Sequence, residues 1–108
     1  MVPGEIKMIP TNFAVAIPPG FEIQVRPRSG LAARHGIMVP NSPGTIDCNY
    51  TDEWKILLYN AGPEPFEIQP GDRIAQAVFT WSEQLEYVEA DEIDENRSRG
   101  GGFGSSGR

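Results

Sequence analysis

The chain has 108 residues, a formal net charge of −6 at pH 7, and 39% hydrophobic residues. This length predicts one small domain, which oligomerisation would help to stabilise. The negative charge argues against a general nucleic-acid binder, whose affinity comes from many lysine and arginine contacts with phosphates. No apolar run approaches membrane-spanning length, no signal peptide is visible, and the single Cys48 excludes a disulfide framework or a multi-cysteine zinc site. We therefore expect an intracellular protein, located in the cytoplasm or, in a eukaryote, also in the nucleus or an organelle.

The N-terminal half predicts short strands separated by turns. Glu5–Ile9 and Phe13–Ile17 are the first two, and Phe21–Arg26 alternates strictly between apolar and polar residues, as a half-buried strand does. Pro-Gly pairs border such segments and suit the central positions of a type II turn. The four pairs are Pro3-Gly4, Pro19-Gly20, Pro43-Gly44 and Pro70-Gly71.

The C-terminal half predicts two further strands, Trp54–Tyr59 and Arg73–Phe79, the second of them buried. Between them, Phe66 and Ile68 share a face. A helix can fit inside Ser82–Glu92, but Gly and Pro leave little room for helices elsewhere. Many short strands with closely spaced turns indicate a sandwich or a barrel. The predicted fold is therefore all-β, of jelly-roll type.

The composition changes after Ala90. Residues 91–95 are mostly acidic, and glycine and serine dominate the last residues of the chain, with Phe103 as the only large apolar residue beyond Ile93. Such a segment cannot bury enough apolar surface to fold by itself. We expect a β domain over residues 1–90 and a flexible arm over residues 91–108.

Three segments combine residues that could carry chemistry. Arg28-Ser29-Gly30 offers a charged fork, a hydroxyl and a close backbone approach to a phosphate, although such a triplet is often a simple turn. The hairpin predicted over 44–50, preceded by Asn41, contains Asp47, a potential general base; the alternative is a hairpin with polar turn residues.

The third segment contains Gln76 within an otherwise apolar run, where it needs hydrogen-bond partners at a sheet edge or on a ligand. The only histidine, His35, has no second metal ligand at a recognisable spacing and is expected at the surface. Cys48 is expected to pack, and Trp54 and Trp81 to lie in a core or an interface.

These segments occur in a telling order: PRSGLAARHG, NSPGTIDCNY, IQPGDRIAQ and GGFGSSG. They strongly resemble four of the five signature motifs of the homotrimeric dUTP diphosphatases (dUTPases), and the resemblance covers nearly the whole chain. It implies a β-clip jelly roll assembled as a trimer whose active sites are each built from all three subunits. It also implies hydrolysis of dUTP to dUMP and pyrophosphate with Mg²⁺, which substrate phosphates and water hold rather than direct protein ligands.

The resemblance assigns roles residue by residue. Asp47 matches the aspartate that activates the attacking water, and Tyr50 matches the ring under the deoxyribose that leaves no space for a 2′-hydroxyl. Phe103 matches the arm aromatic that stacks on uracil. The other matching residues of the uracil pocket are Asn41, Gly44, Thr45 and Ile46; those of the phosphate site are Arg28, Ser29, Gly30 and Gln76, with Gly104 and Ser105 from the arm.

Two departures from the family pattern qualify the resemblance. The first motif, an Ala-Gly-x-Asp-Leu type segment, is absent, which implies an N-terminally truncated chain or a separate chain that supplies it. The arm position that usually holds arginine is Ser98, flanked by Arg97 and Arg99. We expect Arg99 to contact the phosphates, with Arg108 as a further contact.

Two alternative functions are weighed against hydrolysis of dUTP. The dCTP deaminases share the fold but have a catalytic glutamate two positions before a tyrosine, and here Leu57 occupies that position before Tyr59. Without that carboxylate the deaminase base is missing. A non-catalytic nucleotide-binding or interaction module is the second alternative, and the missing first motif gives it weight.

Overall fold

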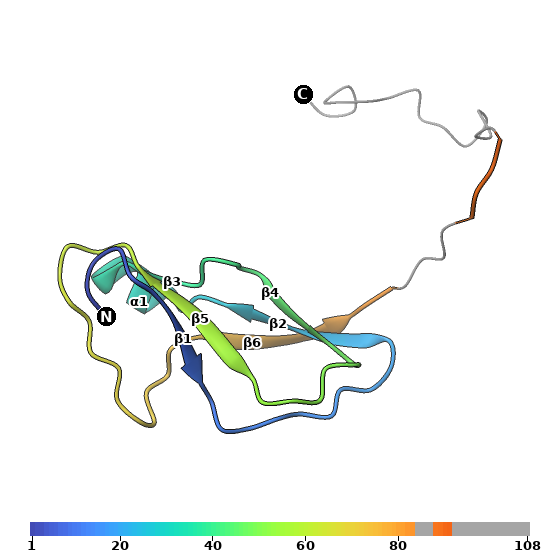
Figure 1. Ribbon diagram of the computed structural model, residues 1–108, viewed down its shortest axis with the longest axis horizontal. Coiled ribbons are helices and arrows are strands. Elements are labelled where there is room, and N and C mark those ends of the chain that lie inside the picture. Colours follow the sequence, from blue (N-terminus) through green and yellow to red (C-terminus); the bar gives the residue numbers. More distant parts are fainter. Residues whose placement is uncertain (84–87, 92–108) are drawn as a thin grey trace.

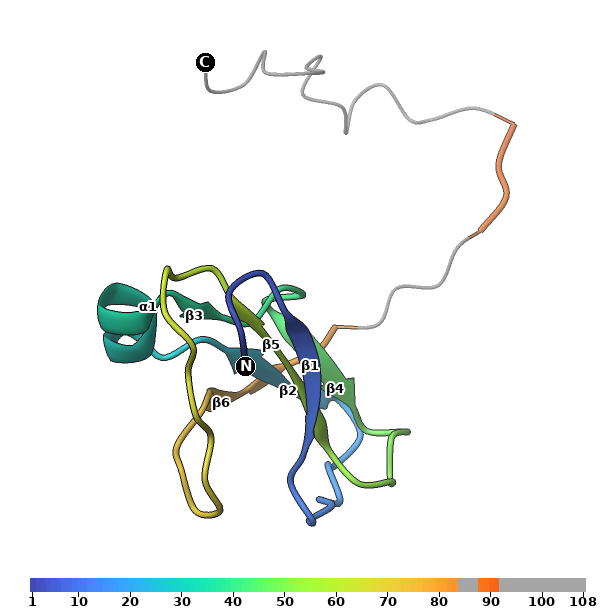
Figure 2. The ribbon, with the colours of Figure 1, turned by 60° about the vertical axis from the view of Figure 1, so that its left-hand side comes forward.

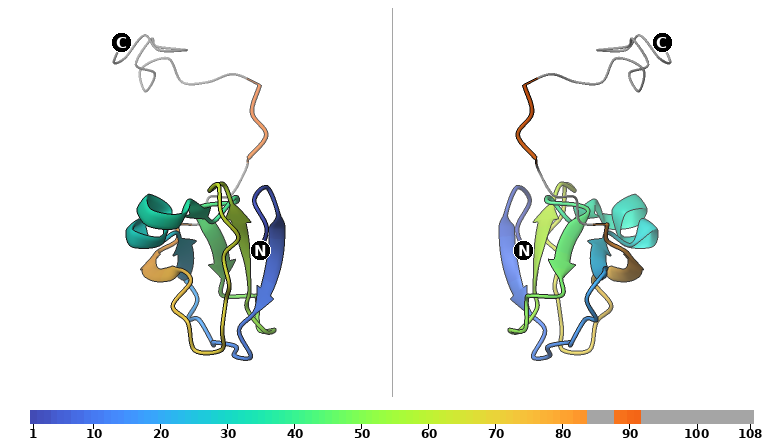
Figure 3. Two further views of the ribbon diagram at one scale, coloured as in Figure 1. Left: turned by 90° about the vertical axis from the view of Figure 1, so that its left-hand side faces the viewer. Right: turned by 90° about the vertical axis from the view of Figure 1, so that its right-hand side faces the viewer.

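The computed structural model describes residues 1–83 and 88–91. These residues form two antiparallel sheets of three strands each, ordered β1-β5-β3 and β4-β2-β6 (Figure 1). Figure 3 shows the sheets as two layers, with β1 on one side and α1 and β6 on the other. The predicted all-β, jelly-roll-like fold is confirmed. The elements are β1 (Ile6–Pro10), β2 (Phe21–Arg26), α1 (Ser29–His35), β3 (Ile37–Met38), β4 (Gly44–Asp47), β5 (Lys55–Asn60) and β6 (Gln76–Trp81).

The core lies between the two sheets and follows the period of two that strands impose. In β2, Ile23 and Val25 are buried between half-buried or exposed polar neighbours, and in β5 Ile56 and Leu58 alternate in the same way. Burial of one such side chain contributes about 1.5–3 kcal/mol. The buried hydrophobic residues are Ile17, Ile23, Val25, Ile37, Val39, Trp54, Ile56 and Leu58.

One buried polar side chain, Asn60, joins three segments at the end of β5. Its amide nitrogen donates to the carbonyl oxygens of Met1 (3.1 Å) and Glu64 (2.9 Å), and its amide oxygen accepts from the Gly62 N–H (3.0 Å). Figure 2 shows the connection after β5 passing beside the N-terminal segment. The backbone N–H of Phe66 also donates to the Met1 carbonyl there. The side chains of Phe66 and Ile68 both pack against the core, on the shared face that the sequence predicts.

The predicted strand over Phe13–Ile17 is wrong. The Phe13 carbonyl still accepts the Trp54 N–H (3.0 Å), but the chain then leaves β5 and finds no strand partner among the described residues. Phe13 and Val15 are exposed, and only Ile17 is buried. The segment is therefore anchored by the buried side chain of Ile17 and is not a paired strand.

A helix that the sequence does not predict, α1, forms directly after Arg28. Leu31, Ala32 and Ala33 favour helix strongly enough to outweigh Gly30. Gly36 ends the helix in the left-handed region (φ 70°), where its N–H bonds to the Ala32 carbonyl at 3.0 Å. The seven-residue helix leaves the fold class unchanged.

The strand predicted over Arg73–Phe79 is displaced and is not buried. β6 begins at Gln76 and pairs only with β2, at the edge of its sheet. Phe79 and Trp81 stack on Phe21, with ring centroids 4.7 and 4.4 Å apart, yet both remain exposed. The helix allowed within Ser82–Glu92 falls largely outside the described residues.

We predict that Gly62→Ala destabilises the fold. The α1–β3 junction crosses the chain after β5 so closely that a Cβ on Gly62 would lie against the carbonyl oxygen of His35. Such overpacking costs about 1–3 kcal/mol of unfolding free energy, measurable by urea denaturation. In Gly30→Ala the new Cβ meets only the flexible end of Arg34, so this helical control should be neutral or stabilising. Equal stabilities for the two variants would contradict the close crossing.

Candidate active site

A cavity of about 650 Å³ lies between β4 and β5 and is called the base cavity here. Its volume falls within the range usual for small-molecule sites, about 300–1,000 Å³. Among the described residues, those that the resemblance assigns to the uracil pocket line this cavity, and so does Asp47, the predicted general base. These residues are Asn41, Gly44, Thr45, Ile46, Asp47 and Tyr50, joined by Asn49.

The chain turns sharply at the end of β4. One oxygen of Asp47, Oδ1, accepts the Asn49 N–H at 2.8 Å, and the Asp47 carbonyl accepts the Tyr50 N–H at 3.2 Å. Within the described part of the chain, the other carboxylate oxygen of Asp47 has no hydrogen-bond partner. The predicted hairpin is therefore a strand followed by a tight turn: β4 pairs with β2, and the chain then crosses to the other sheet. This turn holds one face of the carboxylate and leaves an oxygen available.

Gly44 brings the backbone close to Asn41 at the start of β4. A Cβ at this buried glycine would lie 3.2 Å from Asn41 Nδ2 and 3.6 Å from Val25 Cβ. Glycine therefore allows the Asn41 amide to lie against the β4 backbone. Amide and backbone groups together can match the donors and acceptors of a planar polar ligand.

A second cluster, the arginine corner, joins the start of α1 to the start of β6 and comprises Arg28, Ser29, Gly30, Arg73 and Gln76. Two reciprocal bonds hold it. Arg28 Nη1 donates to the Arg73 carbonyl (2.9 Å), and Gln76 Nε2 donates to the Pro27 carbonyl (3.0 Å). Arg28 uses one of its five N–H donors in this contact, which leaves the others for an anion.

The two clusters face different spaces within one chain. Arg28 and Gln76 line a cavity of about 1040 Å³, together with Lys7 and Arg73, whereas Asp47 and its neighbours line the base cavity. No hydrogen bond in residues 1–83 and 88–91 joins the two clusters. A single chain thus carries the predicted base pocket and the predicted phosphate site as separate halves.

The remaining predictions have mixed outcomes. Arg97, Arg99, Phe103, Gly104, Ser105 and Arg108 lie outside the described residues. His35 is exposed and packs on Phe66 (centroids 5.1 Å apart), and Cys48 packs beside Trp54, as expected. Trp54 is core and Trp81 is exposed. The sequence reasoning missed Glu53, whose carbonyl accepts the Tyr50 hydroxyl at 2.6 Å, because no motif marks it.

Across the described ranges, no group of three or more His, Cys, Asp or Glu side chains comes together. The same residues contain no helix long and apolar enough to cross a membrane.

Comparisons with known proteins agree with this geometry. A family model described as dUTPase matches residues 1–107. A deoxyuridine 5′-triphosphate nucleotidohydrolase of Rickettsia felis is 51% identical over 104 residues, which cover 96% of this chain and 70% of that protein.

Solved structures are similar as well. A mutant dUTPase of Staphylococcus bacteriophage 80alpha with dUpNHpp has a TM-score of 0.78 at 26% identity, over 99% of this chain and 79% of that one. A mutant dUTPase from phage phi11 of S. aureus, which coordinates a structural Mg(II) ion, has a TM-score of 0.72 at 21% identity, over 86% of this chain and 76% of that one. The second likeness shows the fold alone.

Proposed function

The chain belongs to the dUTPase family and is a dUTP hydrolase, and we propose that it forms dUMP and pyrophosphate with Asp47 as the base. The observation that carries this assignment is the gathering of Asn41, Gly44, Thr45, Ile46, Asp47 and Tyr50 around the base cavity. Asp47 Oδ1 is held by the Asn49 N–H, so the second oxygen can accept a proton from water as that water attacks the α-phosphorus.

The base cavity supplies the specificity in this proposal. Asn41 and the β4 backbone present amide and carbonyl groups to the polar edge of uracil. Cytosine exchanges a donor for an acceptor at that edge, which would leave buried groups unpaired and weaken its binding. Tyr50 lies under the deoxyribose.

The arginine corner binds the phosphates. Arg28 offers its free N–H donors, while Ser29 and Gly30 offer a hydroxyl and a close backbone approach. Gln76 completes the corner. Mg²⁺, held mainly by phosphate oxygens and water, would neutralise charge developing on the phosphates.

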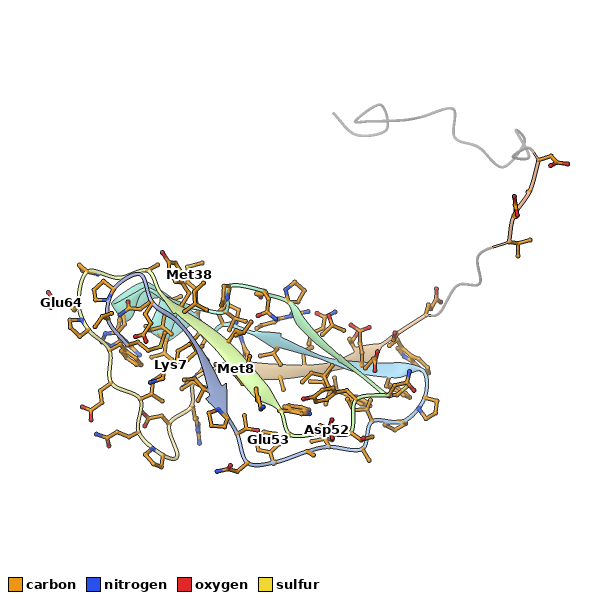
Figure 4. The ribbon with its side chains drawn as sticks, viewed as in Figure 1. Lys7, Met8, Met38, Asp52, Glu53 and Glu64 are labelled. Carbon is orange, nitrogen blue, oxygen red and sulfur yellow. The ribbon has the colours of Figure 1, made fainter. Side chains whose placement is uncertain are left out.

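The separation of the two clusters favours a homotrimer with shared sites. The base cavity of one subunit would meet the arginine corner of another, which a single chain keeps apart. Exposed apolar residues on the outer face of the β1-β5-β3 sheet offer surface for such contacts: Ile6, together with Met8 and Met38, which Figure 4 labels.

The division into a β domain and an arm remains part of the proposal. Residues 91–108 would reach a neighbouring site, where Phe103 stacks on uracil and Arg99, Gly104 and Ser105 lie along the phosphates. Since the curated relative is bacterial, we place the enzyme in the cytoplasm.

The first prediction from this proposal concerns Asp47 as the general base. Asp47→Asn keeps an oxygen for the Asn49 N–H but removes the proton acceptor, so pyrophosphate release should fall by about 10²–10⁴-fold. Binding of dUpNHpp should change little. Asp52→Asn, which removes a neighbouring charge, is the control and should keep full activity. An Asp47→Asn variant as active as the control would exclude Asp47 as the base. If the unchanged chain binds dUpNHpp but releases no pyrophosphate, the protein is instead a binding module.

The second prediction tests the shared site by mixing two inactive variants. Random trimers from equal amounts of Asp47→Asn and Arg28→Ala should recover about one quarter of the original activity, because each intact site draws these residues from different subunits. Each variant alone should stay inactive. No recovery after verified subunit exchange would mean that both residues act within one subunit.

The third prediction concerns the arm. Phe103→Ala should weaken dUpNHpp binding by about 1–3 kcal/mol if the ring stacks on a base. Calorimetric titration measures this difference, and Phe103→Tyr, which keeps a stacking ring, serves as the control. Unchanged affinity in Phe103→Ala would remove the stacking role.

A further inference from the structure

Four hydrogen bonds clamp the segment after β1 to the connection that enters β5. The Thr11 N–H and hydroxyl both donate to the Trp54 carbonyl, at 3.1 and 2.7 Å, and the Trp54 N–H donates to the Phe13 carbonyl at 3.0 Å. The fourth bond uses a side chain: Glu53 Oε2 accepts the Asn12 N–H at 2.9 Å. Asn12 adopts the left-handed region (φ 65°), which asparagine tolerates better than most residues.

Glu53 connects this clamp to the base cavity. Its carboxylate is tied to Asn12, while its backbone carbonyl accepts the Tyr50 hydroxyl at 2.6 Å. Tyr50 is therefore held at both ends, by its N–H on the Asp47 carbonyl and by its hydroxyl on Glu53. Tyr50 as a residue is 40% exposed and lines the cavity, so these two hydrogen bonds help to fix its position.

The neighbouring carboxylate provides a contrast. Figure 4 labels Asp52 and Glu53 together, where the connection into β5 lies beside the segment after β1. Asp52 is exposed, and its side chain makes no hydrogen bond to any residue in the described part of the chain. Both carboxylates are negatively charged and lie in the same loop, but only that of Glu53 takes part in the clamp.

We propose that the Glu53 carboxylate is a positioning residue that holds the Tyr50 ring against the sugar and so maintains selection of deoxyribose over ribose. This inference rests on the proposed role of Tyr50. Ring position matters because a 2′-hydroxyl is excluded only if the ring cannot move away. Loss of the Asn12 contact leaves the peptide that carries the Glu53 carbonyl held only through Trp54, whose N–H bonds to the Phe13 carbonyl, so the carbonyl that accepts the Tyr50 hydroxyl loses one of its two supports.

The experiment compares dUTP with UTP. In Glu53→Ala, the ratio of kcat/KM for dUTP to that for UTP should fall by about 3- to 10-fold, the range of a lost hydrogen bond. Glu53→Gln keeps an amide oxygen for the Asn12 N–H and should preserve the ratio within about twofold. Asp52→Ala should leave it unchanged. A merely structural role would lower turnover of both nucleotides and leave their ratio intact.

Further measurements test whether the effect acts through Tyr50 and whether it arises in binding. Tyr50→Phe removes only the hydroxyl that bonds to Glu53, so it should lower the ratio as Glu53→Ala does, and the double variant should add little. The Kd ratio for dUpNHpp and its ribose counterpart UpNHpp reports the same discrimination without turnover, and thermal unfolding checks that each variant is folded.

The outcomes separate the inference from the proposed function. A lowered ratio in Glu53→Ala, with Glu53→Gln and Asp52→Ala near the unchanged chain, supports the positioning role. An unchanged ratio in Glu53→Ala overturns it while leaving dUTP hydrolysis intact. If Glu53→Ala does not fold, an unchanged ratio in Tyr50→Phe overturns it equally. Failure of the unchanged chain to bind either analogue would overturn the proposed function and the inference together.

Discussion

The end of the molecule that carries the arginine corner depends on the hydrogen bonds of one buried side-chain amide, that of Asn60. It bonds to Met1, Gly62 and Glu64, and its own backbone pairs with Gly4 and Glu5. Each bond stabilises segments that have little regular structure of their own. Removing the amide would leave buried backbone groups unsatisfied, at about 1–3 kcal/mol for each. Gly62, which Asn60 holds, also crosses closely with Gly36 at the end of α1, where the Ala61 N–H donates to the Gly36 carbonyl at 2.8 Å.

The two ends of the sandwich are therefore organised by different means. At the arginine corner, the side chains of Arg28 and Gln76 bond to each other's neighbouring backbone. At the base cavity, the tight turn after β4 is tied through Tyr50 and Glu53 to the segment after β1. The core of Val25 and Ile56 separates them and borders both cavities. A rigid core between two anchored loops suits an enzyme whose halves must each hold a fixed geometry.

Local pattern predicted the fold wherever one face of a strand is buried. The alternation in Phe21–Arg26 matches β2 to the residue, since one face packs on the core. It failed for Phe13–Ile17, because a short run of apolar residues does not report whether a partner strand is present. Sequence reasoning also missed α1, because Gly30 obscured the helix-forming Leu31, Ala32 and Ala33. The motifs located the base cavity, but Glu53 was invisible because its contribution is one backbone carbonyl and one contact with a residue far away in the sequence.

The net charge of −6 opposes binding of the negatively charged triphosphate of dUTP. The distribution of charged residues over the molecule matters here more than the net charge. Lys7, Arg28 and Arg73 line one cavity with only Glu67 and Asp72 as acidic neighbours, and the Asp72 carboxylate already accepts the Gln69 N–H. Asp47 lies in the other cavity, so a single chain does not present this carboxylate and Arg28 to the same space. In the proposed shared site, the Asp47 carboxylate would meet the phosphates only where the arginine corner of another subunit and a cation offset the repulsion.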